Sequence, residues 1–372
     1  MYLLIYFIYR LLYCWRHHLK FTDQEDPWLC FKYYRENSAP NKKNLWQVLK
    51  DTNKLIKYWH RFPDTYFIFC HWLKEYNDWD KIYSFLPQRN YSLALGDLGG
   101  AEITPYKILI NDKILCHELL THYGIPVPKM LLVYRNNTFF IGNRIVKDEE
   151  VDKMLGETID ERLFVKLASE GAARGVFIMK RTFEGYMLDG NKVSASLFRQ
   201  RFIGKSMFIE PSLKQESFLH AFNPDTVNTV RVLTLNDTNG NIKIISAAVR
   251  FGRKGGFVDN MHAGGLAVSI NLNTGCMESY GARRHEPTKY YEHPDSHIKF
   301  EGCKVPQWDE IRSLVIRTLT YLPPYRSVGF DIVTSENGPL VLEINTGAGM
   351  DLAQVGKEKG IADAFSKYAK HY

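Results

Sequence analysis

The segment GFDIVTSENGPLVLEIN, residues 329–345, places two carboxylates and one amide inside two apolar runs. We expect the two runs to pair as antiparallel strands around a short loop at 336–338. In that hairpin Asp331 lies directly opposite Glu343. Asn345 shares their face because it lies two positions beyond Glu343. The three oxygen-bearing side chains are therefore expected to converge on one side of the hairpin.

The register of this hairpin depends on its turn. A three-residue loop that ends in Gly338 pairs Ser335 with Pro339, whereas a bulge in the turn would shift the pairing by one residue. The face opposite the carboxylates is expected to be buried. It carries the apolar residues Ile332, Leu342 and Ile344.

Two carboxylates directly opposite each other repel, and burying them unpaired costs still more free energy. A divalent cation removes both objections. A ligand set with oxygen donors alone suits Mg²⁺, which commonly shares its coordination shell with substrate phosphates. The hairpin therefore predicts a nucleotide-phosphate partner. The alternative is a solvent-facing edge strand that holds no ligand.

Further residues suit an anionic ligand. Lys166 lies in the middle of an apolar run, where a buried lysine needs an anion such as the phosphates of ATP. The loop after it contains Gly171 and Gly175, whose backbone can approach phosphates closely. Arg231 and Arg250 lie in neighbouring predicted strands and suit a clamp on a γ-phosphate or an acyl phosphate. The alternatives are a lysine that extends to water, an ordinary turn, and surface ion pairs.

Apolar periodicity predicts the elements that must position these residues. Strands are predicted at 129–135, 138–143, 162–169, 175–181, 206–213, 229–236, 242–252 and 266–273. Helices are predicted near 111–123 and at 148–157, 309–323 and 360–370. The stretch 46–83 is also expected to be helical, and the glycines and Pro105 of ALGDLGGAEITPY indicate a boundary.

Composition adds weaker limits. The chain has 372 residues, 45% of them hydrophobic, and a formal net charge of +7. It lacks a block of like charges, so a nucleic-acid partner is not indicated. Its six cysteines form no CxxC pair, which disfavours a zinc or redox site and favours a reducing, cytoplasmic location.

The N-terminal segment MYLLIYFIYRLLYCWRHHLK, residues 1–20, is aromatic and ends in basic residues. Its uncharged run is too short to span a bilayer, and it lacks the features of a signal peptide. Two interpretations stay open: a helix packed on its own domain, and a peripheral contact with the inner face of a membrane.

Several segments together resemble the ATP-grasp ligases. The hairpin is similar to their metal-binding D…E-x-N hairpin. NDKILCHELLTHYGIPVPK, FVKLASEGAARGV and MFIEPSL are similar to their entry helix, glycine loop and adenine hinge. AFNPDTVNTVRVLTL is most similar to the sugar-transfer-associated ATP-grasp family. The resemblance covers roughly residues 80–372. The metal-binding hairpin is its most specific part.

The resemblance implies roles for individual residues. Asn260 and His262 fall in a loop that would cover the acceptor site near the γ-phosphate, where His262 would act as a base or orient a substrate. A solvated loop histidine is the alternative for His262, and a plain surface lysine is the alternative for Lys113. The residues implied at the nucleotide are Lys113, Lys166, Gly171, Gly175, Glu210 at the adenine hinge, and Gln215 as a ribose partner.

The fold implied is an α/β (α+β) ATP-grasp fold in which two subdomains, 106–210 and 211–372, close on ATP. A helix-rich region, 1–105, precedes them. The implied reaction joins a carboxylate to an amine through an acyl phosphate, with ATP and one or two Mg²⁺ ions held by Asp331, Glu343 and Asn345. The family name suggests glycan or surface-polysaccharide substrates. The alternatives are a kinase on the same scaffold and a non-catalytic nucleotide-binding partner of a glycan-synthesis assembly.

Overall fold

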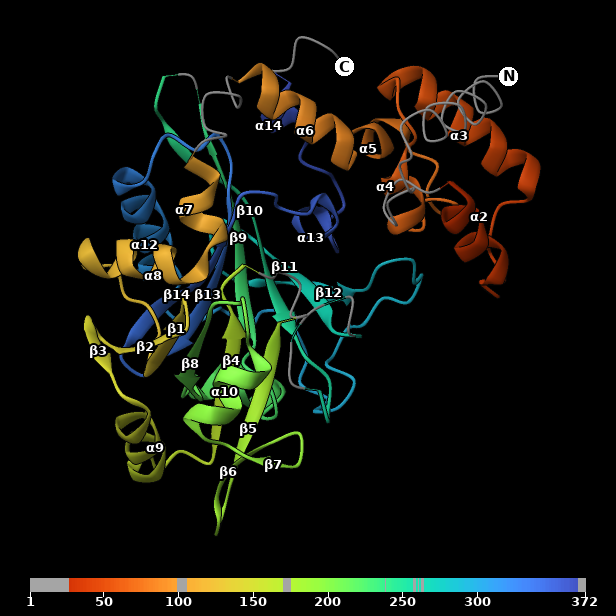
Figure 1. Ribbon diagram of the computed structural model, residues 1–372. Helices are drawn as coiled ribbons and strands as arrows, with labels where there is room; N and C mark the ends of the chain where they lie inside the picture. The colour runs from red at the N-terminus through yellow and green to blue at the C-terminus, as the bar shows by residue number, and fades with distance from the viewer. Residues whose placement is uncertain are drawn as a thin grey trace, which may run out of the picture.

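The computed structural model has an α+β architecture, in which a helical region comes first and two antiparallel sheets follow (Figure 1). This arrangement confirms the predicted mixed fold class with a helix-rich N-terminal region. The described residues are 27–98, 106–169, 175–237, 239–256, 259, 261 and 264–366. The predictions for Gly171, Asn260, His262 and the segment 1–20 lie outside these ranges.

The N-terminal helices range from five to 15 residues in length, and most of them carry several aromatic side chains. They are α2 (Pro27–Glu36), α3 (Leu45–Trp59), α4 (Asp64–Ile68), α5 (Trp79–Tyr83) and α6 (Gln88–Asp97). The start of α3 is fixed by Asn44, whose side chain forms a capping box with Gln47. The stretch 46–83 is not one helix, because His60 takes a left-handed φ of 55° at the end of α3 and Pro63 follows it.

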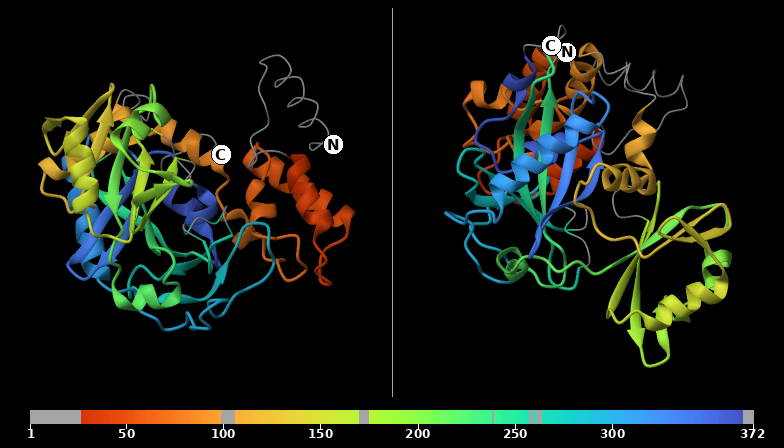
Figure 2. Two further views of the ribbon diagram at one scale, coloured as in Figure 1. Left: turned by 60° about the horizontal axis from the view of Figure 1, so that its bottom comes forward. Right: turned by 90° about the vertical axis from the view of Figure 1, so that its left-hand side faces the viewer.

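The first sheet forms a lobe of its own, drawn in yellow and green in Figure 2. Its strands are β1 (Leu132–Arg135), β2 (Thr138–Ile141), β3 (Arg144–Val146), β4 (Arg162–Leu167), β5 (Val176–Thr182), β6 (Gly185–Leu188), β7 (Asn191–Lys192) and β8 (Met207–Pro211). Their order is β3-β2-β1-β8-β4-β5-β6-β7. Helices α9 (Asp148–Glu157) and α10 (Ala195–Arg201) pack on this sheet around a core of its own. The short strands β3, β6 and β7 and the helix α10 have no counterpart among the predicted elements.

The second sheet, drawn in green to blue in Figure 1, has the order β12-β11-β10-β9-β13-β14. Its strands are β9 (Thr229–Asn236), β10 (Ile242–Phe251), β11 (Leu266–Ile270), β12 (Met277–Ala282), β13 (Gly329–Ser335) and β14 (Gly338–Asn345). The helices around it are α7 (Lys107–Asn111), α8 (Lys113–His122), α11 (Ser217–Phe222), α12 (Trp308–Tyr321), α13 (Met350–Gln354) and α14 (Ala362–Phe365). The predicted strand 229–236 is confirmed as β9, whereas β12 and α11 were not anticipated. The domain boundaries near residues 105 and 210 stay predictions.

The second sheet is covered on both faces, which explains the nearly continuous apolar run of β9. Val230 and Val232 point into a core that includes α12. Leu233 and Leu235 belong to the core of the N-terminal helices, which also takes in residues of α13 and α14. The N-terminal region therefore shares its core with the second sheet and with the end of the chain.

The hairpin of β13 and β14 has the predicted pairing of Asp331 with Glu343, but its turn and its register differ from the prediction. Its loop has two residues rather than three, because Ser335 pairs with Gly338, which has a positive φ of 105°. The prediction that Ser335 pairs with Pro339 is wrong by one position. A β-bulge between Asp331 and Ile332 then shifts the register back by one residue, so that Asp331 lies opposite Glu343 as expected.

This shift changes which residues of β14 are buried. Ile332 and Ile344 are buried as predicted, but Leu342 is only half-buried. Val341 takes its place in the core with an exposed fraction of 1%. Because the extra residue of the bulge interrupts the alternation of side chains, Val341 rather than Leu342 shares the inner face with Ile344.

We predict that His71 makes the N-terminal region sensitive to mild acid. Its ring lies 4.6 Å from Phe85 and 4.9 Å from Tyr76, between ring centroids. Burial, helped by the nearby Lys43 ammonium, lowers the His71 pKa to about 3. The unfolded chain binds this proton below a pKa near 6.5 and the folded chain does not. The contribution to stability is therefore full above pH 6.5 and is lost progressively as the pH falls toward 3.

Between pH 7.5 and pH 5, His71 is expected to account for a loss of about 2 kcal/mol in the free energy of unfolding. Urea unfolding of the wild type and of His71→Phe at both pH values measures this difference, and the exposed His122→Phe serves as control. An equal loss in the wild type and in His71→Phe would contradict the assignment.

Candidate active site

One cavity of about 490 Å³ is lined by residues from both sheets and from α8. The first sheet contributes side chains from β4 and β8, and the second contributes side chains from β9, β10, β13 and β14. The sequence-predicted residues that line it are Lys113, Lys166, Gly175, Glu210, Gln215, Arg231, Arg250, Asp331, Glu343 and Asn345. All the predicted site residues that the structure describes therefore line a single cavity.

A row of paired residues crosses the second sheet at this cavity. Arg231 of β9 pairs with Ala248 of β10 on one side and with Asp331 of β13 on the other. Asp331 in turn pairs with Glu343 of the edge strand β14. Directly paired residues of antiparallel strands share a face of the sheet. The register therefore brings the arginine and both carboxylates to the same face.

Asp331 is the centre of a buried ion network. Its carboxylate accepts hydrogen bonds from Arg231 Nε at 2.6 Å and from Arg231 Nη2 at 3.1 Å. Arg250 Nη2 lies 3.3 Å from Asp331 Oδ2, and Asn345 Nδ2 lies 3.5 Å from the same oxygen. Only 3% of Asp331 is exposed. The two arginines thus balance the buried carboxylate, a compensation that the sequence argument had assigned to a metal ion alone.

Arg250 is held from its other side by Asp259. The two groups lie 3.2 Å apart, and Asp259 also accepts hydrogen bonds from the backbone and hydroxyl of Thr229. Burial opposes the charge on Arg250, but Asp259 and Asp331 outweigh it and raise the pKa of the guanidinium. Burial also opposes the charge on Asp259 and raises the pKa of its carboxyl, although the nearby Arg250 lowers it in part. The arginine is therefore fixed in place as a cation.

Glu343 and Lys113 form a looser pair at the mouth of this network. Lys113 is the first residue of α8, and its Nζ lies 3.5 Å from a Glu343 oxygen. Asp112 caps the same helix by accepting hydrogen bonds from two backbone amides, so a carboxylate offsets the unfavourable position of a cation there. The Glu343 side chain is 31% exposed, far more than that of Asp331.

On the opposite wall, Lys166 of β4 pairs with Glu210 of β8 at 2.5 Å. Arg162, Phe164 and Lys166 of β4 line the cavity, whereas Leu163 and Val165 between them are buried in the core of the first sheet. A buried lysine at position 166 was predicted to need an anion, and Glu210 is the anion that the chain itself supplies. A glutamate with 5% exposure costs little when a lysine neutralises it.

Two other predicted nucleotide residues have different surroundings. Gly175 is buried beside the end of β4, where its carbonyl accepts a hydrogen bond from the Leu167 amide at 2.8 Å. Gln215 is also buried, and its side-chain amide bonds both the N–H and the C=O of the Asn228 backbone. Because this amide is committed to the backbone, Gln215 is a poor candidate for a ribose contact.

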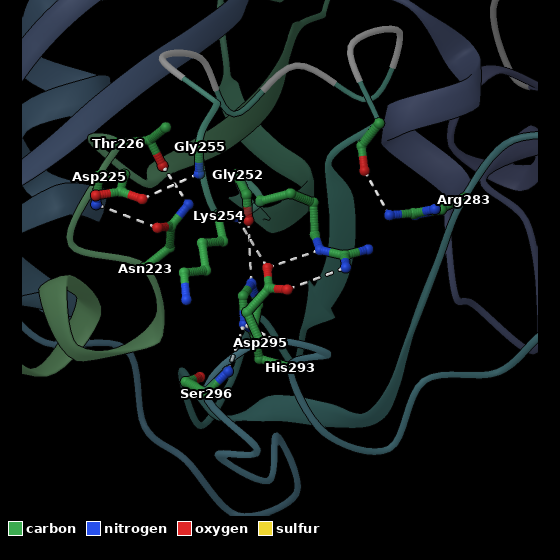
Figure 3. A network of polar contacts seen from close by, with 12 residues as sticks. Asn223, Asp225, Thr226, Gly252, Lys254, Gly255, Arg283, His293, Asp295 and Ser296 are labelled. Atoms are coloured by element: carbon green, nitrogen blue, oxygen red, sulfur yellow. Dashed lines mark hydrogen bonds and ion pairs between the residues drawn. The ribbon is translucent and has the colours of Figure 1, made fainter.

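The segment around the predicted acceptor loop is anchored by a polar network, shown in Figure 3. Arg253 binds Asp295 through two nitrogens at 2.7 and 3.0 Å, and the Lys254 amide also donates to Asp295. These hydrogen bonds, Arg253 first, lower the Asp295 pKa to about 2. Beyond the loop, Arg283 donates to the Gly264 carbonyl at 2.6 Å. Both described ends of the loop are thus fixed.

Comparison with known proteins identifies the family. Residues 104–370 match the family described as sugar-transfer associated ATP-grasp. The chain belongs to this ATP-grasp family. The predicted resemblance and the predicted ATP-grasp fold are therefore confirmed. No curated protein matches the chain.

Solved structures similar to this ATP-grasp chain are distant in sequence. One is the D-alanyl-alanine synthetase A of Vibrio cholerae, with 14% identity and a TM-score of 0.41 over 71% of this chain and 61% of that chain. Another is the biotin carboxylase of Campylobacter jejuni in a complex with beta-gamma-ATP, with 12% identity and a TM-score of 0.42 over 71% of this chain and 47% of that chain. The chain thus spans less than two thirds of the length of either protein.

ATP-grasp enzymes in general use ATP and Mg²⁺, and the cavity can be tested for both. Its described lining contains five lysine and arginine side chains and six aspartate and glutamate side chains, a formal charge of −1. A triphosphate would therefore find no net positive charge there, and it needs accompanying cations to bind. Glu343, Asn345 and Asp331 offer oxygen donors on one face of the hairpin, which fits Mg²⁺.

Sequence reasoning missed several polar residues in or beside the cavity. Asp259, Arg284 and Asp351 are among them and lie in loops or in a short helix. Such segments have no apolar period to indicate which side chains point inward. The only available signal is the proximity of Asp351 to the TGAGM run that follows Asn345.

Within the described residues, no helix is long and apolar enough to cross a membrane. All described cysteines, Cys30, Cys70, Cys116, Cys276 and Cys303, are free thiols.

Proposed function

We propose that this ATP-grasp protein is an ATP-dependent carboxylate–amine ligase. The observation that carries the proposal is the convergence of two lysines, two arginines and the carboxylate hairpin on one cavity between two sheets. No single one of these residues is specific. Their arrangement around a cavity of about 490 Å³ suits a nucleotide together with a small second substrate.

We assign Lys113 and Lys166 to the phosphates of ATP, since each reaches the cavity from a different wall. Both lysines are paired with carboxylates, and a phosphate would compete with Glu343 and Glu210 for them. Glu210 precedes Pro211 at the end of β8 and would meet the amino edge of adenine beside apolar neighbours such as Phe208. We leave Gln215 out of the nucleotide site.

Asp331, Glu343 and Asn345 would hold Mg²⁺, which when bound neutralises charge on the phosphates and polarises the group that is transferred. Arg231 and Arg250 are fixed cations whose role is to stabilise negative charge on the transferring phosphoryl group. Because Asp331 and Asp259 hold them in place, they require little reorganisation during the reaction.

The chemistry proposed has two steps. A carboxylate oxygen attacks the γ-phosphate of ATP, which releases ADP and gives an acyl phosphate. The nitrogen of an amine then attacks the acyl carbon, loses a proton and displaces inorganic phosphate. The chain's own contribution is to position the two reactants and to keep water away between the steps. Asn260 and His262 are proposed for the loop that covers this acceptor site.

The substrates follow from the family description alone. "Sugar-transfer associated" suggests a sugar acid or a glycan-linked carboxylate, joined to an amino acid or another small amine. A contact of residues 1–20 with the inner face of a membrane would suit a membrane-linked glycan, and we keep it as part of the proposal.

Mass spectrometry of products tests the proposal. The full chain is incubated with ATP, Mg²⁺ and pooled sugar acids and amino acids. We expect a condensation product together with ADP and phosphate, formed only when both pools are present. A stable phosphorylated sugar formed without an amine would indicate a kinase instead. ATP binding without turnover across the panel would indicate a non-catalytic partner.

A further inference from the structure

Asp351 is a cavity-lining carboxylate that the proposed chemistry leaves without a role. It lies in α13, directly after the segment that follows Asn345, and lines the cavity together with Gly349 and Leu352. Its side chain is 8% exposed. A carboxylate this buried on a cavity wall requires a partner charge.

Arg284 supplies one such charge. Arg284 Nε lies 3.2 Å from Asp351 Oδ2. Oδ1 occupies the space beside Gly349, where an added Cβ would come within 2.3 Å of it. Within the described residues Oδ1 accepts no hydrogen bond. Glycine at 349 therefore leaves room for the carboxylate, and Gly349 and Asp351 both line the cavity.

The N-terminal helices hold the Asp351–Arg284 ion pair in place. Gln88 of α6 accepts a hydrogen bond from the Met350 amide at 2.8 Å, and Gln354 of α13 bonds both the N–H and the C=O of Leu86. On the Arg284 side, the next residue, His285, donates its backbone N–H to Ile68. Tyr33 of α2 stacks on the His285 ring with centroids 4.0 Å apart.

Both partners of the pair are thus fixed by residues of the helical region, which precedes the matched range 104–370. A buried ion pair is weak support for stability, since apolar pairs of similar size often serve as well. An ion pair fixed from two directions at a cavity wall is better explained by recognition of a charged ligand.

We propose that Asp351 binds the amine co-substrate in its ammonium form, with Arg284 holding the carboxylate in position. This inference rests on the proposed function, because it names the second substrate class of the same site. The shared chemistry is a primary ammonium group, which an amino acid or an amino sugar could provide. Oδ1 accepts a hydrogen bond from the ammonium while Oδ2 keeps its contact with Arg284. The ammonium releases one proton to water before its nitrogen attacks the acyl carbon.

The test uses the full chain with ATP, Mg²⁺ and pooled sugar acids. One arm titrates α-amino acids and another titrates amino sugars, and a third supplies hydroxylamine, an uncharged nucleophile that traps an acyl phosphate as a hydroxamate. In Asp351→Asn the KM of the amine is expected to rise about 10- to 100-fold, with a much smaller change in the KM of ATP. The ratio of amine product to hydroxamate falls with it.

Two further variants guard against a purely structural effect. The double variant Asp351→Asn/Arg284→Gln removes both charges, so no buried charge is left unpaired, and it is expected to show the same rise in KM. Asp309→Asn, on the exposed part of α12, is the matched control and should behave as the wild type.

The outcomes separate this inference from the function on which it rests. If the wild type forms products with amines and hydroxylamine, but Asp351→Asn keeps the wild-type KM for the amine, the amine site is wrong and the ligase stands. If the wild type forms neither product, the ligase fails. Thermal unfolding with a non-hydrolysable ATP analogue then decides the site: an amine-dependent rise in Tm that Asp351→Asn lacks supports it, and its absence in the wild type overturns it.

Discussion

An Asp331→Ala variant is expected to lose both ATP turnover and stability. Turnover should fall by a factor on the order of 1,000 or more, because the change removes a proposed metal ligand and releases the two proposed catalytic arginines. Asp331 is 3% exposed and pairs with Arg231 and Arg250. Removing one partner of a buried ion network typically costs about 3–5 kcal/mol. Urea unfolding and ADP release measure the two effects on the same preparation.

A Glu343→Gln variant separates the role of the hairpin carboxylates in metal binding from their role in stability. Glu343 is one-third exposed, and its ion pair with Lys113 at 3.5 Å is long. Its loss should therefore change the free energy of unfolding by less than about 1 kcal/mol. Turnover should still collapse, and the Mg²⁺ concentration needed for residual activity should rise. Full turnover in Glu343→Gln would contradict the metal assignment, and native stability in Asp331→Ala would contradict the buried network.

The contrast between these two carboxylates marks where sequence reasoning succeeded. Apolar runs predicted most of the longer strands, because a half-buried or doubly buried strand has a strong local signature. The short strands β3, β6 and β7 and the strand β12 were missed. The hairpin pairing of Asp331 with Glu343 was also correct, yet the turn was not. Two deviations cancelled: a loop shorter by one residue and a bulge at the level of Asp331. No local pattern distinguishes that combination from the simpler hairpin.

The charge balance of the site was harder to predict. Two facing carboxylates implied a cation, and the sequence offered only a metal ion as an explanation. The folded chain places Arg231 directly beside Asp331, although the two are 100 residues apart. Lys166 and Glu210 likewise meet across adjacent strands. Such pairs arise from the strand order of the two sheets, which periodicity along a single strand does not reveal.

The packing of the N-terminal helices against the second sheet and α13 could not be predicted from the sequence either. The glycines that precede Pro105 suggested a boundary, which would leave the site to the remainder of the chain. The core instead joins Leu233 and Leu235 of the second sheet to these helices, and Gln88 and Gln354 tie them to α13. Contacts of this kind depend on which faces of short helices meet, and sequence spacing does not specify them.

A Lys166→Met variant is expected to bind ATP with a dissociation constant about 10- to 100-fold higher than that of the wild type. A charge-assisted hydrogen bond to phosphate contributes roughly 1.5–3 kcal/mol, and each 1.4 kcal/mol changes affinity tenfold. Adenosine lacks phosphates, so its affinity should change little. Titration calorimetry with ATP, ADP and adenosine measures the series.

The pair with Glu210 requires a second variant. Removing Lys166 alone leaves Glu210 buried with an unpaired charge, which would itself weaken the site. Lys166→Met/Glu210→Gln removes both charges, and the phosphate-dependent loss should persist in it. Lys153→Met on the exposed face of α9 is the matched control. An equal loss of affinity for adenosine and ATP would assign Lys166 to the architecture of the hinge rather than to the phosphates, because only a phosphate contact can discriminate between these two ligands.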